Sequence, residues 1–204
     1  MILIVPYRDR LEHLQKFVEH YKGFKILVVE QANDKLFNRG KLFNVGFNES
    51  KDDIVIFHDV DLLVHDSWCY LELDESMGAV HLSGLCEQFN YKVPYETCFG
   101  GVTAFDADSF LKCNGFSNDF WGWGGEDDDL YNRTKLAGVN VRFSQNKYYS
   151  LKHEKQPITQ HYKVNKVLCT QTDKTWLKCG LNSMRYEVIK KDTIFGVQRI
   201  LVNI

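Results

Sequence analysis

The sequence of 204 residues lacks several features that would assign it at once to a class of protein. It has no apolar run long enough to cross a bilayer, because the apolar run at its start, residues 1–5, has only the length of a strand. The polar residues 7–10 end that run too early for a signal peptide. A formal net charge of −2 gives no basic surface for nucleic acid. We therefore expect no membrane span and no nucleic-acid partner.

The six cysteines show none of the spacings that bind zinc, and no two of them form a C-x-x-C pair. In a chain of this size without a secretion signal, we expect free thiols, several of them buried. Free thiols persist in reducing compartments, so the sequence predicts a cytoplasmic protein.

What is present favours one globular domain over residues 1–204, since 44% of the residues are hydrophobic and 14% are aromatic. The chain opens with a buried strand at 1–5 that Pro6 ends, a helix at 11–21 with apolar residues at helical spacing, and a second buried strand at 26–29. A third strand at 54–57 is apolar on both faces. This β-α-β opening predicts an α/β domain with a mixed central sheet flanked by helices.

Weaker patterns follow along the chain. They predict strands at 78–82, 98–104 and 139–143, a helix over 127–137, a turn at 180–183 that leads into 186–189, and a last pair of strands over 194–204. Asp106 or Asp108 would cap a short helix that ends near Gly115. Residues 153–172 are polar, contain Pro157 and show little periodicity, so we expect a loop there and a mobile lid over about 149–172.

The most distinctive stretch is residues 120–129, in which two tryptophans alternate with glycines and lead into four carboxylates. A glycine loop that cradles phosphate is excluded on charge, since four acids repel a phosphate unless a metal intervenes. A flexible turn followed by an acidic first helical turn remains open, because the helix dipole favours acids there. The functional alternative is a sugar site, in which indole faces cover a pyranose and a carboxylate acts as general base.

Two further stretches carry charge at strand ends. On extended backbone Asp59 and Asp61 would point the same way, and two such carboxylates repel each other unless a cation or a donor lies between them. Oxygen ligands of this kind suit Mg²⁺ or Mn²⁺. Residues 37–41 enter a helix with Arg39 in its first turn, which is consistent with an anion site or with a solvated basic turn.

Several motifs together resemble the β-1,4-galactosyltransferases and their N-acetylgalactosaminyltransferase relatives, of glycosyltransferase family 7. The motifs lie in the family's order at residues 5–10 (VPYRDR), 37–47 (FNRGKLFNVGF), 57–63 (FHDVDLL), 99–102 (FGGV), 120–129, His153 and 180–183 (GLNS). They cover nearly the whole chain, and as a set they are highly specific.

The resemblance implies a GT-A fold and an inverting transfer that depends on Mn²⁺, with Mg²⁺ as an option. The donor would be UDP-galactose or UDP-N-acetylgalactosamine, and the acceptor a sugar hydroxyl of a glycan or glycoconjugate, joined in a β-1,4 linkage. Members of this family are usually lumenal Golgi enzymes with a membrane anchor and a longer stem. This chain shows neither and looks like a bare catalytic core.

The resemblance also implies roles for individual residues. The uridine and diphosphate would be held by Pro6, Arg8, Arg10, Phe37 and Arg39, and the rest of the donor would contact Asp59, Val60, Cys98, Gly101 and Trp123. Asp61 and His153 would bind the metal. Asp127 resembles the catalytic base and Glu126 would help to orient the donor sugar. The acceptor would contact Tyr95, Trp123, Gly124 and Asp128.

The chain departs from the family pattern in the pocket that holds an acceptor N-acetyl group and near the metal. The pocket positions are Asn165, Lys166 and Cys169, which would not make the same pocket. Ser150 stands where the family has a methionine ligand, and Gln88 where a lysine often lies near the diphosphate.

The position that separates galactose from N-acetylgalactosamine donors is Cys98. Cysteine is smaller than the usual tyrosine, so it leaves a gap that an acetamido methyl would fill, and burying such a group is worth about 0.8 kcal/mol. Its thiol is only a weak donor toward a galactose 2-hydroxyl. Both effects favour UDP-N-acetylgalactosamine.

Two alternatives to the transferase remain open. A carbohydrate- or UDP-sugar-binding module could keep the fold and lose turnover. Ser150 favours this alternative, because it replaces a metal ligand of the family. The presence of Asp61, an expected metal ligand, and of Asp127, the expected base, argues against it. A Mg²⁺-dependent phosphohydrolase has little support, because neither a nucleophile nor a second carboxylate cluster is evident. His58 and His81 receive no functional assignment.

Overall fold

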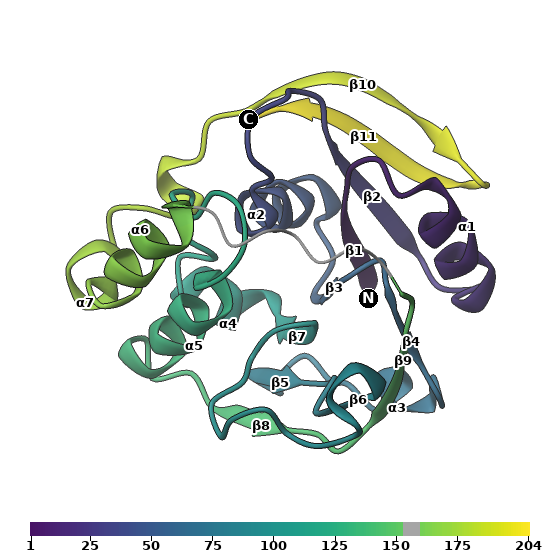
Figure 1. Ribbon diagram of the computed structural model, residues 1–204, viewed down its shortest axis with the longest axis horizontal. Coiled ribbons are helices and arrows are strands. Elements are labelled where there is room, and N and C mark those ends of the chain that lie inside the picture. The colour runs from purple at the N-terminus through teal and green to yellow at the C-terminus, as the bar shows by residue number, and fades with distance from the viewer. Residues whose placement is uncertain (153–159) are drawn as a thin grey trace.

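The computed structural model describes residues 1–152 and 160–204. Within them an eight-stranded sheet has the order β10-β11-β2-β1-β3-β7-β5-β8 (Figure 1). Its strands are β1 (Ile2–Tyr7), β2 (Ile26–Gln31), β3 (Ile54–His58), β5 (Ala79–His81), β7 (Val102–Asp106), β8 (Val141–Phe143), β10 (Glu187–Ile194) and β11 (Val197–Asn203). A smaller sheet pairs β4 (Leu62–Val64), β9 (Lys147–Ser150) and β6 (Leu85–Cys86).

Helices lie on both sides of the main sheet. They are α1 (Leu11–His20), α2 (Arg39–Ser50), α3 (Trp68–Leu71), α4 (Ala107–Lys112), α5 (Glu126–Leu136), α6 (Gln160–Cys169) and α7 (Thr172–Thr175), with short 3₁₀ turns η1 (Glu87–Phe89) and η2 (Leu181–Ser183). None of the helices in the described part of the chain is long and apolar enough to span a membrane.

The direction of the central strands decides where a site can form. β1 pairs in parallel with both β2 and β3, so the carboxyl ends of these three strands meet at one edge of the sheet. β7 runs antiparallel to β3, so the residues that precede β7 reach the same edge. In α/β sheets this edge is where ligands bind.

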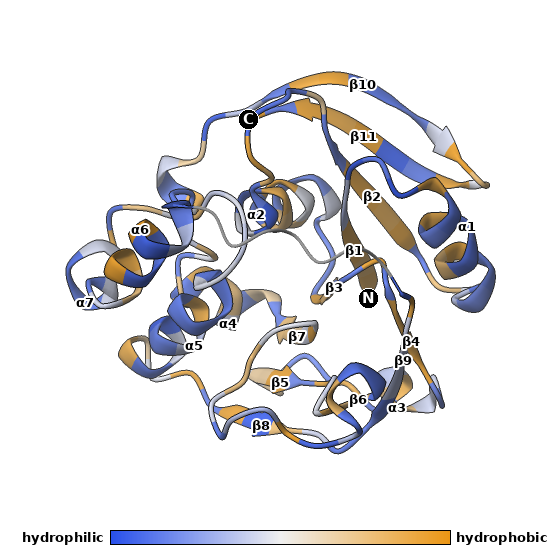
Figure 2. Cartoon of the chain, viewed as in Figure 1, coloured by the Kyte–Doolittle hydropathy of each residue, from blue (hydrophilic) through white to orange (hydrophobic). Residues whose placement is uncertain are grey.

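The core consists of two apolar layers, one on each face of the sheet. Successive side chains of β1 and β2 alternate between the layers, and both strands are largely orange in Figure 2. Leu14 and Phe17 of α1 pack on one face together with residues of the smaller sheet. Phe43 of α2, Phe110 of α4 and Leu130 of α5 pack on the other. Burial on both faces explains why β1 to β3 are continuously apolar.

The mixed α/β sheet with flanking helices confirms the predicted fold class, and β2, β3, α1, α5 and β11 lie where the sequence predicts them, whereas β10 begins earlier, at Glu187. Asp106 caps α4, accepting a hydrogen bond from Ser109 N–H at 2.7 Å. Pro6 does not end β1, which continues to Tyr7, because a proline removes only one donor from the ladder. The strand expected at 98–104 begins only at Val102, so the two glycines before it belong to a loop.

The expectation of a loop over 153–172 is wrong for its described part, where α6 and the start of α7 lie. The sequence signal is weak because Asn165 is the one buried residue of α6, and Val164 and Val167 are exposed. An amphipathic stripe, on which periodicity depends, is therefore missing. The mobility of a lid at about 149–172 remains a prediction.

Candidate functional site

Loops that follow the three parallel strands bring most of the predicted donor residues to one edge of the sheet. Arg8 and Arg10 follow β1, Arg39 begins α2 after β2, and Asp59 and Asp61 follow β3. Residues 98–101 precede β7 and arrive at the same edge from the opposite direction. The sheet topology thus gathers segments that are far apart in the chain.

Arg39 lies at the centre of this arrangement. Its Nε donates to Asp59 Oδ1 at 2.6 Å, and its Nη1 donates to Asp127 Oδ1. Nη1 also lies 3.5 Å from Glu126 Oε1, and the guanidinium stacks over the Phe43 ring at 4.7 Å from its centroid. The side chain is only 14% exposed, so one cation links the turn after β3 to the first turn of α5.

Burial and mutual repulsion shift the protonation of these acids. Burial raises the pKa of Glu126 well above its ordinary value, the neighbouring charge of Asp127 raises it further, and Arg39 opposes both. Burial also raises the pKa of Asp59; Arg39 lowers it, and Asp61 raises it. Burial would lower the pKa of Arg39, but the carboxylates around it outweigh that effect and raise it. Glu126 Oε2 is buried without a hydrogen-bond partner, which leaves an acceptor toward a ligand.

The sequence predicts that the two aspartates after β3 lie on extended backbone, but this expectation is wrong. They form a turn in which Leu62 N–H donates to Asp59 O at 3.4 Å. Asp59 faces Arg39, and Asp61 Oδ2 accepts from Arg10 Nη1 at 3.0 Å. The expected proximity nevertheless holds, because the charge of Asp61 raises the pKa of Asp59.

These carboxylates fit part of a divalent-cation site. Carboxylate oxygens are the ligands that Mn²⁺ and Mg²⁺ prefer, and a cation beside Asp61 would relieve the repulsion between the two acids. His153, the other expected ligand, lies outside the described residues. Within the described residues no group of three His, Cys, Asp or Glu side chains could hold a metal. Ser150 Oγ accepts a hydrogen bond from Gln88 N–H at 3.3 Å. These two residues, which both differ from the family pattern, are therefore in contact.

The glycine loop presents Asp127 to the site. Gly124 and Gly125 have φ of +97° and +94°, which residues with a side chain rarely adopt, and α5 begins directly after them. A Cβ on Gly100 would lie 2.6 Å from Asp127 Oδ2, so any side chain there would displace the carboxylate. Trp123 is 55% exposed, and its ring lies 5.4 Å from that of Tyr162 on α6.

A hollow beside this loop is lined by one of the predicted acceptor residues, Asp128. Tyr95 Oη donates to Asp128 Oδ1 at 3.0 Å. A cavity of about 510 Å³ is lined by Gly125, Asp128, Asn132, Tyr162, Lys166, Cys169 and Thr170. Asn165 is only 2% exposed, and its Nδ2 donates to Gly124 O and Trp121 O. It therefore holds the tryptophan-glycine loop in place.

The remaining predicted donor residues lie around the same edge. Arg8 Nη1 donates to Lys35 O at 2.7 Å, and its guanidinium lies 5.4 Å from the Phe37 ring centroid. Pro6 and Val60 are buried. Cys98 is half-buried, and burial raises the pKa of its thiol. A Cβ on Gly101 would meet Ser83 Oγ at 2.6 Å, so this glycine is needed for close packing.

Sequence reasoning misses a buried asparagine network that holds the site together. Asn38 caps α2 through Lys41 N–H at 2.9 Å and donates to Asn118 O at 2.8 Å. Asn118 Nδ2 donates to Gly180 O at 2.7 Å, and Asn44 bonds both N–H and C=O of Phe116. The available signal is Asn44, which stands among the apolar residues Leu42, Phe43 and Val45 of α2, since buried amides need partners.

Comparison with known proteins identifies relatives over the whole chain. A family model described as the N-terminal region of glycosyl transferase group 7 matches residues 1–72, and one described as the N-terminal domain of galactosyltransferase matches residues 80–154. The chain is 36% identical to β-1,4-galactosyltransferase 3 of Cricetulus griseus over 93% of its length, and 39% identical to β-1,4-galactosyltransferase 6 of Mus musculus over 90%. It spans 52% and 51% of these relatives, about half of their length.

A solved structure is similar over the full chain. The catalytic domain of Drosophila β1,4-galactosyltransferase 7, in complex with xylobiose, shares 30% identity with a TM-score of 0.78, and covers 100% of this chain and 92% of that one. A mutant of the same enzyme, in complex with manganese, UDP-Gal and xylobiose, shares 29% identity with the same TM-score. These GT-A enzymes confirm the expected GT-A architecture.

The expected cytoplasmic location is wrong. The matching proteins are β-1,4-galactosyltransferases, which are Golgi membrane enzymes. The expectation depended on the lack of a leader and on free cysteines. Because the chain spans only about half of these relatives, the lack of a leader within 204 residues says nothing about compartment.

Proposed function

The chain belongs to the β-1,4-galactosyltransferase family, glycosyltransferase family 7, and from this premise we propose that it is an inverting, metal-dependent glycosyltransferase. It transfers galactose from UDP-galactose to a sugar hydroxyl and forms a β-1,4 linkage. The observation that carries the proposal is the position of Arg39, which joins the Asp59 turn and the Asp127 carboxylate in one ionic cluster. The guanidinium of Arg39 thereby holds the turn that would bind the donor close to the carboxylate that would act as the base.

Asp127 is the general base of this reaction. Its Oδ2 faces the Gly100 backbone, and its Oδ1 is held by Arg39, so the carboxylate is oriented before substrate binds. It removes the proton of the attacking hydroxyl as the new bond to the anomeric carbon forms. Attack on the face opposite the leaving UDP inverts that carbon. General base catalysis of this kind contributes roughly 10²–10⁴-fold to the rate.

The diphosphate leaves toward the cationic side of the site. Arg8 and Arg10 follow β1, and Arg10 contacts Asp61; the guanidinium of each can form charge-assisted hydrogen bonds to phosphate oxygens. Asp61, together with His153 by family resemblance, would hold Mn²⁺, which when bound supplies positive charge for the departing UDP. The pairing of Arg10 with Asp61 keeps both side chains at this place.

Glu126 positions the donor sugar. Its Oε2 is buried without a partner, and the raised pKa of the carboxyl favours a proton on it near neutral pH. A protonated Glu126 offers one donor and one acceptor to adjacent sugar hydroxyls, which suits a hexose.

The curated relatives and the Drosophila enzyme with UDP-Gal support galactose as the transferred sugar. The small side chain at Cys98 extends the choice to UDP-N-acetylgalactosamine. For the acceptor, the exposed Trp123 ring and the Tyr95–Asp128 pair support a pyranose. An aromatic ring can cover the apolar face of the sugar, and a carboxylate can accept hydrogen bonds from its hydroxyls.

The test is UDP release. The protein is incubated with UDP-galactose or UDP-N-acetylgalactosamine, with and without Mn²⁺, and with xylobiose among an array of glycan acceptors. We expect acceptor-dependent UDP release that requires Mn²⁺ and is lost in Asp127→Asn. Binding of UDP-galactose and Mn²⁺ without any release would instead identify a sugar-nucleotide-binding module.

A further inference from the structure

His58 is the last residue of β3, and the reaction proposed above gives it no role. Its side chain is 0% exposed, and it directly precedes the turn with Asp59 and Asp61. Its Nδ1 lies 2.8 Å from the backbone oxygen of Asp59. Its Nε2 lies 2.9 Å from Tyr21 Oη and 2.8 Å from Tyr70 Oη. Both ring nitrogens are therefore engaged.

The partners determine the tautomer of the ring. Burial lowers the pKa of His58 to about 3, so the ring is neutral. A carbonyl oxygen only accepts hydrogen bonds, so Nδ1 carries the proton and donates it to Asp59 O. Nε2 is then an acceptor, and the hydroxyl of Tyr70 or Tyr21 donates to it.

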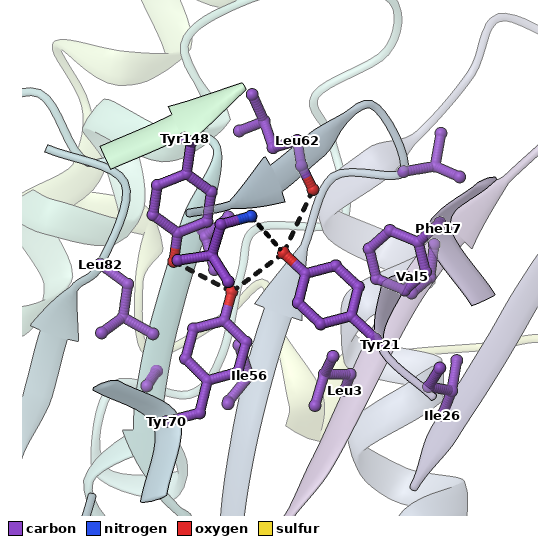
Figure 3. Close-up of a cluster of buried hydrophobic side chains, with 14 of the residues drawn as sticks. Leu3, Val5, Phe17, Tyr21, Ile26, Ile56, Leu62, Tyr70, Leu82 and Tyr148 are labelled. Atoms are coloured by element: carbon purple, nitrogen blue, oxygen red, sulfur yellow. Dashed lines mark hydrogen bonds between the residues drawn. The ribbon is translucent and has the colours of Figure 1, made fainter. Parts of the chain in front are cut away.

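The hydroxyl cluster reaches beyond His58 to the far end of the same segment. Figure 3 shows the hydroxyls of Tyr21, Tyr70 and Tyr148 pointing toward one another. Tyr70 and Tyr148 are joined at 2.9 Å, which brings β9 into the cluster. Tyr21 Oη accepts from Val64 N–H at 2.9 Å and lies 3.3 Å from Leu62 O. The cluster thus contacts the segment that carries the turn at both of its ends.

The turn's backbone is held at Asp59 N–H by Gly101 O at 3.1 Å and at Asp61 O by Leu151 N–H at 2.8 Å, and bond lengths show which contact holds the Asp59 carbonyl. The turn's own hydrogen bond, from Leu62 N–H to Asp59 O, is 3.4 Å long, which is longer than the usual range for such bonds. The bond from His58 to the same oxygen is 2.8 Å, and it comes from a ring held rigidly by two hydroxyls. His58 therefore restrains this carbonyl more strongly than the turn restrains itself.

We propose that His58 is a positioning residue for the transfer: through Nδ1 it fixes the backbone of the turn so that the Asp59 and Asp61 carboxylates are preorganised for the metal-bound diphosphate. The inference rests on the proposed function, since it assigns the turn to donor and metal binding. Side chains that orient metal ligands in this way typically contribute 10–100-fold to metal affinity, which sets the expected effect at about that size.

Two polar substitutions separate the two ring nitrogens. His58→Asn places an amide nitrogen where Nδ1 lies, so it keeps a donor to Asp59 O and loses the contact with the tyrosines. His58→Gln reaches the position of Nε2, so it keeps the contact with the tyrosines and loses the donor to Asp59 O. Tyr186→Phe is the matched control, because it removes a hydroxyl that bonds Glu49 at 2.7 Å, away from the turn.

Mn²⁺ binding is measured by electron paramagnetic resonance of the free ion at saturating UDP, and galactose transfer is measured over a Mn²⁺ titration. We expect His58→Gln to raise the Mn²⁺ dissociation constant by about 10–100-fold, with a smaller change of kcat at saturating Mn²⁺. His58→Asn should lie nearer the wild type, and Tyr186→Phe should match it. Thermal unfolding establishes that each variant is folded.

Two results would overturn the inference: wild-type Mn²⁺ affinity in His58→Gln, or equal losses in the glutamine and asparagine variants. Either would show that the Nδ1 bond does not organise the turn. A wild-type protein that neither binds Mn²⁺ with UDP nor releases UDP would refute the proposed function itself, so the two failures are distinguishable. If one variant does not fold, the other and the control still test the inference against the wild type.

Discussion

Replacing Arg39 by methionine should destabilise the fold, because the carboxylates of Asp59 and Asp127 and the carboxyl of Glu126 would lose their shared cation. Removing one partner of a buried ion pair costs about 3–5 kcal/mol. Glu126 is 9% exposed, but Asp59 and Asp127 remain 29% and 25% exposed, so solvent would screen part of the repulsion. We therefore expect a loss near the lower end, about 3 kcal/mol, which for a protein of this size lowers the Tm by about 6–12 °C.

The loss should depend on pH in a definite direction. Folding already raises the pKa of Glu126 and of Asp59 above their unfolded values, and removal of Arg39 would raise both further. A group with a raised folded pKa binds more protons in the folded than in the unfolded state, so its contribution to stability is lost as pH rises through the folded pKa. The difference between Arg39→Met and wild type should therefore be smaller at pH 5 than at pH 8.

The measurement is urea unfolding of wild type, Arg39→Met and Arg39→Lys at pH 5 and pH 8. Lysine keeps the charge and loses the planar fork, so its stability should be intermediate. Arg199→Met is the control, because Arg199 is also partly buried and binds two acids, Asp192 and Glu30, but away from the Arg39 cluster. Equal free energies of unfolding for Arg39→Met and wild type would refute the ionic cluster as a stabilising element, and a loss that does not change with pH would refute the protonation of Glu126 and Asp59 as its cause.

Three further predictions concern the reaction. Asp127→Asn should bind UDP-galactose and Mn²⁺ in calorimetry yet lose about 10²–10⁴-fold in kcat; near-normal transfer at saturating substrate would mean that the base is another residue. Cys98→Tyr should lower the use of UDP-N-acetylgalactosamine and spare UDP-galactose, and an unchanged ratio of kcat/KM values would exclude Cys98 as the selecting residue. Hydrogen exchange in α6 and around Trp123 should slow when UDP and Mn²⁺ bind, as for a closing lid; unchanged exchange with binding established would remove the lid from the mechanism.

Much of the central sheet follows from sequence because its strands are buried on both faces. β1, β2 and β3 are short, continuously apolar and interrupted by polar loops, so their signal does not depend on periodicity. Parallel pairing of such strands then predicts that Arg10, Arg39 and Asp61 meet at one edge, as they do. This part of the site could be predicted because residues that follow the carboxyl ends of neighbouring parallel strands must lie at the same edge of the sheet.

The contacts within the site could not be predicted in this way. Arg39 lies 88 residues from Asp127, and no spacing rule connects them; only the antiparallel return of β7 and the turn into α5 bring them together. The sequence leaves Arg39 either at an anion site or in a solvated basic turn, and neither alternative includes its pairing with the protein's own acids in the structure. Likewise α6 gave no signal, because it packs through Asn165 and the Trp123–Tyr162 contact instead of an apolar stripe.

The carboxylates and the backbone of the turn after β3 are bound by different residues, so substitutions of these residues should have different effects. Its carboxylates face Arg39 and Arg10, so changes there alter charge as well as geometry. Its Asp59 carbonyl is held by His58, which is neutral and touches no carboxylate in the described contacts, so changes there alter geometry alone. Loss of Arg39 should therefore depend on pH and salt, whereas loss of the His58 bond should weaken Mn²⁺ binding in a manner largely independent of ionic strength.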